Sequence, residues 1–308
     1  MTENLTLAQW IDHVAAQFAA ADLHYGHGTD NEQDEAAWLV LHAAGATLDG
    51  SFDDWGRLAD EATIKKIEEL SRLRCETGKP LAYLTGTAFF AGLAFEVNED
   101  VLVPRSPLAE LILNGFRPWA KPGALQRVLD MCTGSGCIGI AAAVYTPGLR
   151  VDLADISPAA LEVARRNVQR HGVGDRVSLF ESDLFASIPP VAYDLVLANP
   201  PYVPAASVAS LPREYREEPE LGLVSGADGL DAPLAILLDA PRFLCEYGVL
   251  VCEVGESEQR LAALLPDVPF TWLEFEHGGS GVFVLSREEL LSAAPAVEAA
   301  MEKRNDVT

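Results

Sequence analysis

The chain has 308 residues, of which 49% are hydrophobic, so it is long enough for one large domain or two smaller ones around a sizeable core. Its 22 Lys and Arg residues are outnumbered by 46 Asp and Glu residues, which gives a formal net charge of −24 at pH 7. Such a charge repels a phosphate backbone and argues against nucleic acid as the principal partner. It attracts a basic partner, although acidity that only keeps the protein soluble explains it equally well.

The five cysteines are odd in number and show no CxxC spacing, which indicates reduced thiols in the cytosol. The opening stretch MTENLTLAQWIDHVAAQF lacks the basic segment and apolar block of a secretory signal. No apolar stretch approaches the roughly 18 residues needed to span a bilayer. We therefore expect a cytoplasmic protein without a membrane partner, and the sequence leaves its oligomeric state open.

Residues 1–85 are predicted to form a small helical domain, because their apolar residues recur near a 3.6-residue period. The loop YGHGTDN precedes the second helix, and Thr29, Asp30 or Asn31 can cap that helix. His24 and His27 flank the loop, but no Cys or carboxylate stands at ligand spacing, so we favour loop histidines over a metal site. The apolar positions are Leu7, Trp10, Ile11, Val14, Phe18, Ala36, Leu39, Val40, Ile64, Ile67, Leu70 and Leu73.

Residues 86–104 alternate enough to predict a hairpin that turns at Ala91-Gly92 and connects two domains. From residue 127 onward strands alternate with helices, which is typical of a parallel sheet covered on both faces. FTWLEFE and GVFVLS are joined by too few residues for a crossover helix and are expected to pair antiparallel at one edge. We assign residues 105–290 to this second domain and residues 291–308 to a C-terminal tail. The predicted strands are RVLDMC, RVDLADI, RVSLFES, YDLVLAN and GVLVCEV.

Ligands of open α/β sheets bind beyond the carboxyl ends of the strands, so the residues after each predicted strand are the first to inspect. Asp130 closes the first strand, and Gly134 and Gly136 allow a tight turn before a helix. Asp155 closes the second strand and can accept hydrogen bonds from a ribose. After the third strand, Asp183 can accept from an exocyclic amine. Leu184 or Phe185 can cover a flat ring there.

The stretch GSGCIG at residues 134–139 also fits the dinucleotide pattern GxGxxG, with Asp155 near the expected offset. A plain tight connection and solvated, helix-capping aspartates explain these residues as well. The fourth strand end separates the enzyme classes, because it reads Asn199, Pro200, Pro201, Tyr202. A nicotinamide enzyme needs a hydride-handling side chain and has no use for two adjacent prolines, which remove two backbone donors and fix two carbonyls.

The glycine loop with Asp155 and Asp183 resembles the binding site of class I S-adenosylmethionine methyltransferases. NPPY after the fourth strand resembles the signature of those that methylate a planar, conjugated nitrogen. The helical N-terminal part, the hairpin and the PRS segment extend the resemblance to protein N5-glutamine methyltransferases. PRSPLAEL departs from the release-factor branch. Segments along almost the whole chain resemble the branch that methylates large-subunit ribosomal protein three: YGHGTDNEQDEA, VLVPRSPLAEL, LDMCTGSGCI, NPPYV, LPREYREEPELGLVSGADGL and FTWLEFEHGGSGVF.

This resemblance implies a Rossmann-like domain with a seven-stranded, mostly parallel sheet and an antiparallel edge, preceded by a helical substrate-recognition domain. It implies methyl transfer from S-adenosyl-L-methionine, with S-adenosyl-L-homocysteine as product, to a glutamine amide of a basic ribosomal protein. The implied cofactor-binding residues are Asp130, Cys132, Thr133, Gly134, Gly136, Asp155, Ile156, Asp183, Leu184 and Asn199. The implied catalytic residues are Asn199, Pro200 and Tyr202, and the substrate-binding residues are Asn199, Pro200, Pro201, Tyr202 and Arg105.

An amide nitrogen is a poor nucleophile, so we expect catalysis by placement: the Asn199 side-chain oxygen and the Pro200 carbonyl accept the two N–H bonds of the glutamine. Tyr202 would pack against the amide or exclude water. Structural roles are the alternatives: Tyr202 can be a core aromatic residue, Asn199 a turn residue and Arg105 a member of a surface ion pair. No metal is required.

The segment LPREYREEPELGLVSGADGL is long for a connection between a strand and a helix. Its acids Glu214, Glu217, Glu218 and Glu220 are predicted either to line the path of a basic peptide or to form a solvated charged loop. Three other functions stay open. They are methylation of a release factor, methylation of an adenine amino group in nucleic acid, and non-catalytic holding of a ribosomal protein.

Overall fold

The computed structural model describes residues 5–48, 50–120, 123 and 125–305, and the chain divides into two compact units. The helical unit contains Met1–Glu99, Val103–Arg105 and Leu211–Glu217. The sheet unit contains Asp100–Leu102, Ser106–Ser210 and Glu218–Thr308. The hairpin region therefore groups with the helices, and so does a short segment more than 100 residues further along the chain.

The helices of the helical unit begin where side chains cap their free backbone N–H groups. Thr6 and Gln9 form a capping box at the first helix, and Asn31 and Asp60 cap the next two. The hairpin confirms its predicted turn at Ala91-Gly92. The elements are α1 (Leu7–Ala19), α2 (Glu32–Ala43), α3 (Glu61–Thr77), α4 (Leu81–Thr85), β1 (Thr87–Phe90), β2 (Leu93–Glu96) and η2 (Arg213–Glu217).

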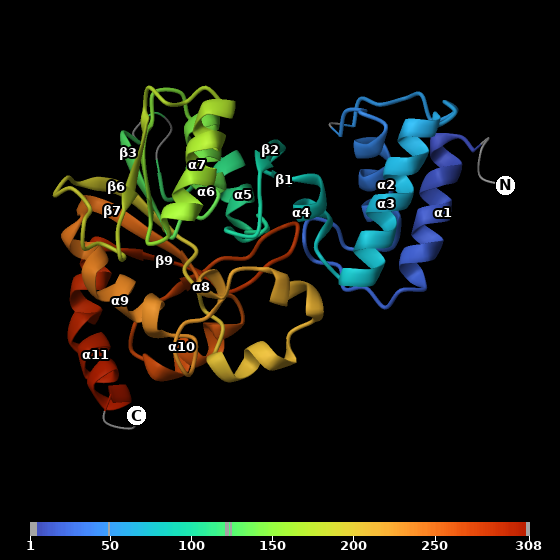
Figure 1. Ribbon diagram of the computed structural model, residues 1–308. Coiled ribbons are helices and arrows are strands. Elements are labelled where there is room, and N and C mark those ends of the chain that lie inside the picture. The colour runs from blue at the N-terminus through green and yellow to red at the C-terminus, as the bar shows by residue number, and fades with distance from the viewer. Residues whose placement is uncertain (1–4, 49, 121–122, 124, 306–308) are drawn as a thin grey trace. The chain divides into compact units, whose positions relative to one another are not determined.

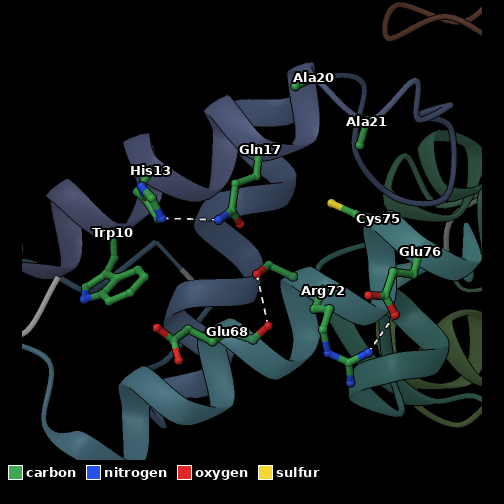
Figure 2. A pocket seen from close by; sticks show the side chains of 10 residues that line it. Trp10, His13, Gln17, Ala20, Ala21, Glu68, Arg72, Cys75 and Glu76 are labelled. Atoms are coloured by element: carbon green, nitrogen blue, oxygen red, sulfur yellow. Dashed lines mark hydrogen bonds and ion pairs between the residues drawn. The ribbon is translucent and has the colours of Figure 1, made fainter. Parts of the chain in front are cut away.

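A groove of about 490 Å³ lies between α1 and α3 of the helical unit (Figure 2). Trp10 and His13 line it from α1, and the ion pair of Arg72 with Glu76, at 2.6 Å, lies on α3. None of the residues that the sequence assigns to the cofactor or the substrate lines this groove.

Within the described residues, the sheet unit is built on a seven-stranded sheet with the order β5-β4-β3-β6-β7-β9-β8. The strands from β5 to β7 are parallel, and β9 and β8 are antiparallel to their neighbours, which confirms the predicted architecture. The strands are β3 (Arg127–Met131), β4 (Arg150–Asp155), β5 (Val177–Glu181), β6 (Tyr193–Ala198), β7 (Leu244–Glu253), β8 (Thr271–Trp272) and β9 (Val282–Ser286).

Helices cover both faces of the sheet, as expected for strands whose side chains are buried almost continuously (Figure 1). Figure 1 draws α6 and α7 in green on one side and α11 in red on the other. Ser157 caps α7 and Pro158 occupies its first turn, as predicted. The helices are α5 (Leu108–Leu113), α6 (Cys137–Tyr145), α7 (Pro158–Arg170), η1 (Ala205–Ser210), α8 (Glu220–Leu223), α9 (Asp231–Asp239), η3 (Ala240–Arg242), η4 (Gly255–Ser257), α10 (Glu258–Leu264) and α11 (Arg287–Asn305).

The C-terminal part differs from the expectation in two ways. The FTWLEFE stretch contributes only the two-residue strand Thr271–Trp272. The region that we expected to be a tail belongs to α11, whose buried residues Leu290, Ala293, Val297 and Ala300 join the core around β7 and α9. Half of this stripe is alanine, so the helix has a weak hydrophobic signal although its face is packed.

Two kinds of feature are absent from the described residues. No helix there combines the length and the apolar content that a membrane crossing requires. No group of three or more His, Cys, Asp or Glu side chains is placed to hold a metal ion in that part of the chain.

The packing of α11 predicts how two adjacent leucines respond to truncation. Leu290 is fully buried, whereas Leu291 is 49% exposed. We expect Leu290→Ala to lower the free energy of unfolding by about 2–5 kcal/mol, because it leaves a cavity. Leu291→Ala should change it by less than about 0.5 kcal/mol. Urea unfolding of both variants measures this, and equal effects would mean that α11 does not pack as described.

Candidate active site

The parallel register places the predicted site residues at one edge of the sheet. Phe180, Ala154, Met131, Ala198 and Cys252 pair in turn across five strands. The residues one position further along therefore form the next row: Glu181, Asp155, Cys132, Asn199 and Glu253. Because neighbouring strands lie about 4.8 Å apart, Asp155 and Asn199 are separated by roughly 10 Å along this row.

Asp130 is fully buried near the end of β3, two positions before Cys132 of this row. Its Oδ2 accepts hydrogen bonds from Thr133 Oγ1 at 2.5 Å and from the Gly139 amide at 2.9 Å. Its Oδ1 has no hydrogen-bond partner within the described part of the chain. Burial, with a smaller contribution from the negative charge of Asp155, raises the pKa of Asp130 to about 7 against these two hydrogen bonds. The orphaned oxygen is an unused acceptor for a cation or a donor.

The turn after β3 contains three residues with left-handed backbone, Cys132, Gly134 and Gly136. An added Cβ on Gly136 would lie 2.8 Å from Ile140 Cδ1 in α6 and 3.3 Å from Leu153 Cδ1 in β4, so this glycine leaves room where α6 begins against the sheet. A Cβ on Gly134 would have no atom within 4 Å, so this glycine borders open space. Thr133 is buried and its amide donates to the Ala154 carbonyl at 3.0 Å, which ties the turn to β4.

Asp155 at the end of β4 is held by two backbone amides. Gly134 donates to its Oδ2 at 2.8 Å and Ser157 donates to its Oδ1 at 2.9 Å. Burial nevertheless raises its pKa, against these hydrogen bonds. Each oxygen keeps a second lone pair, so the side chain can still accept from hydroxyl groups. The neighbouring Ile156 is 47% exposed and offers an apolar surface beside it.

The third strand end is shaped by a hydrogen-bonded turn. Ser182 donates its amide to the Asp155 carbonyl at 2.9 Å and its hydroxyl to the Leu184 carbonyl at 2.6 Å. Leu184 has a left-handed backbone and is half-buried, while Asp183 is exposed. The structure thus holds these two residues directly beside Asp155.

The NPPY segment follows β6, in the row that also contains Asp155. Pro200 is buried, and Asn199, Pro201 and Tyr202 are half-buried. Neither the Asn199 side chain nor the Pro200 carbonyl makes a hydrogen bond to any other described residue. Both oxygens are therefore open to accept from a bound group.

Tyr202 is fixed by residues that the sequence analysis did not single out. Its hydroxyl donates to Glu253 Oε1 at 3.2 Å, and Ser106 donates to Glu253 Oε2 at 2.6 Å. Ser257 donates to the Tyr202 carbonyl at 2.7 Å. The only local signal for Glu253 is its place at the carboxyl end of a strand. The partnership with Ser106, 147 residues away, has none.

Arg105 belongs to the helical unit. Its guanidinium donates to the Val103 carbonyl at 3.1 Å and lies 5.2 Å from the centre of the Tyr215 ring in that unit. These contacts do not test the predicted contact of Arg105 with substrate, which stays a prediction.

Known proteins match both the sheet unit and the whole chain. A family model described as methyltransferase small domain matches residues 110–211. A protein of Xanthomonas campestris pv. campestris is 47% identical over 288 residues, which are 93% of each chain. One of Xylella fastidiosa is 45% identical over 304 residues, 97% of this chain and 96% of that one. Both are named ribosomal protein uL3 glutamine methyltransferase. The chain belongs to this family.

Membership in the uL3 glutamine methyltransferase family confirms the resemblance to the branch that methylates large-subunit ribosomal protein three. Among solved structures, the hMettl16 catalytic domain in complex with an RNA hairpin aligns with 18% identity and a TM-score of 0.49, over 80% of this chain and 90% of that one. The strand order of the sheet and the membership in the family establish the fold of the sheet unit.

The site residues of this family member fit S-adenosylmethionine. The orphaned Asp130 oxygen and the neighbouring Asp155 carboxylate suit a ligand that carries positive charge and hydroxyl groups. The open space at Gly134 allows close approach of a ligand to the backbone. Ile156, directly after Asp155, and Leu184, in the turn after β5, supply apolar surface near Asp155.

The buried carboxyl of Asp130 predicts an unusual pH dependence of stability. Its pKa is about 7 in the folded chain against an ordinary value of 3.8. Between these values the folded state binds a proton that the unfolded state has lost, so this group lowers the free energy of unfolding as pH rises. Asp130→Asn removes this titration, so we compare the free energies of unfolding of the wild type and the variant at each pH. We expect the wild type to lose about 2–3 kcal/mol relative to Asp130→Asn between pH 5 and pH 8. Urea titrations at each pH measure it, and a constant difference would show that Asp130 titrates in its usual range.

Close packing around Tyr202 predicts a costly glycine substitution. An added Cβ on Gly255 would lie 2.6 Å from Tyr202 Cε2, on a left-handed backbone. Gly172 is also left-handed, but a Cβ added there would have no atom within 4 Å, so it is a matched control. We expect Gly172→Ala to destabilise by about 1 kcal/mol and Gly255→Ala by about 2–4 kcal/mol. Equal losses in thermal unfolding would mean that the Tyr202 ring does not lie against Gly255.

Proposed function

We propose that this chain transfers a methyl group from S-adenosylmethionine to the side-chain amide nitrogen of a glutamine in ribosomal protein uL3, with S-adenosylhomocysteine as product. The observation that carries the proposal is the NPPY segment in one row with Asp155, in a chain of the uL3 glutamine methyltransferase family. The acidic balance of the chain suits a basic protein substrate and a weak affinity for nucleic acid. We place the reaction in the cytoplasm, where ribosomal proteins are made.

The residues around Asp130 and Asp155 hold the cofactor in this proposal. When bound, S-adenosylmethionine supplies a methyl group on a positively charged sulfur. Asp130 accepts from its ammonium group, Asp155 accepts from its ribose hydroxyls, and Asp183 with Leu184 holds its adenine. Cys132, Thr133, Gly134 and Gly136 form the turn along its methionine part. Ile156 packs against the adenosine.

Asn199 and Pro200 bind the reacting amide. The lone pair of an amide nitrogen is delocalised, and removing its proton beforehand requires a base far stronger than any side chain at pH 7. The Asn199 side-chain oxygen and the Pro200 carbonyl accept the two N–H bonds and orient the amide plane. Near-attack placement of this kind supplies about 7–11 kcal/mol in favourable cases. As the methyl carbon bonds to the nitrogen and its bond to sulfur breaks, positive charge develops on the nitrogen, and the same oxygens stabilise it more strongly than in the ground state. The nitrogen then releases one of its two protons to solvent, which leaves a neutral N-methyl amide and S-adenosylhomocysteine.

The neighbouring residues keep these acceptors in place and complete the substrate site. The rings of Pro200 and Pro201 restrict the backbone, and Tyr202 excludes water and packs against the amide. Arg105 contacts the substrate from the connector that joins the helical unit to the sheet unit. The helical unit recognises the remainder of the protein substrate.

The decisive experiment combines a labelled methyl donor with purified uL3, a release factor and ribosomal RNA in separate reactions. We expect label in uL3 alone. Asn199→Ala should lower kcat by about 10²-fold, because one of the two acceptors is lost, and leave the Kd of S-adenosylmethionine within a few fold. Asn114→Ala, at an exposed asparagine of the same unit, is the control.

Label in the release factor or in RNA would assign the chain a different substrate. Unchanged kcat in Asn199→Ala would remove the proposed role of the NPPY acceptors. Binding of uL3 without transfer of label would indicate a protein that only holds its partner.

A further inference from the structure

An Ω-loop of residues 203–226 follows directly on Tyr202. Its two ends meet in the sheet unit, where they form a neck of three backbone hydrogen bonds. Val203 donates to Leu223 at 2.8 Å, Ser225 donates to Val203 at 3.0 Å, and Ala205 donates to Gly226 at 2.9 Å. The residue after the NPPY segment is thus the first residue of the neck.

The tip of the Ω-loop, Leu211–Glu217, belongs to the helical unit. Glu214 at the tip is 1% exposed, and it accepts from Arg74 Nη1 at 3.2 Å and from the His24 amide at 2.9 Å. Arg74 is also 1% exposed and donates from Nε to Glu35 at 2.5 Å. Its remaining donors contact the carbonyls of Gly78 and His24, both at 3.0 Å. The expectation of a solvent-facing acid at Glu214 is therefore wrong.

Arg213 supplies a second attachment of the tip. Its guanidinium donates to the Cys75 carbonyl at 3.1 Å, and an added Cβ on Gly78 would lie 2.6 Å from its Nε. The ring of the neighbouring Tyr215 lies 4.7 Å from the His27 ring. The tip is thus packed on the helical unit by one buried ion pair, one arginine and one aromatic ring.

The buried ion pair stays charged. Burial raises the pKa of Glu214, but the His24 amide and Arg74 outweigh it and hold the pKa below its ordinary value. Burial lowers the pKa of Arg74, but the hydrogen bonds and negative charges of Glu35 and Glu214 have a larger effect and raise the pKa above its ordinary value. Removing one partner leaves a buried charge with fewer donors or acceptors, which is far more disruptive than removing a surface pair.

Anchoring the tip also favours closure of the neck. The neck holds the two ends of a loop together, and the entropy of the free residues between them opposes this closure. When the tip is fixed, the residues between Ala205 and Leu223 are divided into two short, ordered segments. When the tip is released, the loop gains conformational entropy in the open state, and this gain opposes the three hydrogen bonds of the neck.

We propose that Arg74 and Glu214 are positioning residues of the methyl transfer: they fix the tip of the Ω-loop in the helical unit and thereby keep its neck, and Tyr202 beside it, in the reactive arrangement. This inference rests on the proposed function for its catalytic readout. Its structural readout, the opening of the neck, is independent of the substrate.

The test compares Glu214→Ala with Glu76→Ala in the full chain. Glu76 pairs with Arg72 on the exposed face of the helix that carries Arg74, so its removal breaks an ion pair without leaving a buried charge (Figure 2). We expect Glu214→Ala to speed amide exchange at Val203, Ala205 and Ser225. It should lower kcat/KM for uL3 by about 10- to 100-fold, as displaced reactants do, while the Kd of S-adenosylmethionine stays within twofold. Glu214→Gln keeps an acceptor, so its amide exchange and its kcat/KM should lie between those of Glu214→Ala and the wild type. Glu76→Ala should match the wild type.

Two results would overturn the inference: neck amides in Glu214→Ala that exchange as in the wild type, or faster exchange with unchanged kcat/KM. If Glu214→Ala does not fold, Arg213→Ala decides by the same two criteria, since it loosens the tip without leaving a buried charge. If the wild type transfers no methyl group to uL3, the proposed function fails by itself. The exchange of the three neck amides then decides whether the tip holds the neck.

Discussion

The site depends on the in-register parallel pairing of β4, β3, β6 and β7. This pairing brings the carboxyl ends of four strands to one edge and sets Asp155, Cys132, Asn199 and Glu253 in a row. A shift of one residue in any strand would move its terminal side chain to the opposite face of the sheet. The continuous Val, Leu and Ala content of these strands buries both faces of the sheet, so the close packing of individual side chains, and not an apolar–polar alternation, must hold the register.

On this edge the structure separates two kinds of polar group. Asp130 and Asp155 are held by hydrogen bonds from the protein, although Asp130 keeps one buried oxygen without a partner among the described residues. The Asn199 side chain makes no hydrogen bond to any of the described residues. The rigidity of the NPPY segment therefore comes from elsewhere. It comes from the proline rings and from Tyr202, which Glu253, Ser257 and the Gly255 backbone fix in place.

The sequence allowed the sheet, the strand ends and the NPPY segment to be predicted, because these signals are local: a strand pattern followed by an acid, a glycine or two prolines. It did not reveal Glu253 with Ser106, or Glu214 with Arg74, because each pair joins residues more than 100 positions apart and each member alone is an ordinary polar residue. The helix α11 escaped prediction for a different reason. Its buried stripe is half alanine, whose small side chain carries a weak apolar signal even when it is packed.

The buried ion pair changes how the acidity of the chain should be understood. Glu214 and Glu218 are buried, and the charge of Glu214 is balanced by Arg74. Two of the four acids counted as a surface for a basic peptide are thus unavailable for that role. Electrostatic attraction of a basic protein is left to acids that reach the solvent, such as Glu220 and those outside the loop, where it speeds encounter and weakens as salt rises. Local acid clusters therefore cannot be assigned to substrate binding from composition. In the proposed mechanism, the buried charges of Glu214 and Arg74 instead hold the Ω-loop in place, and a fixed loop helps the two proposed oxygen acceptors to orient a flat amide.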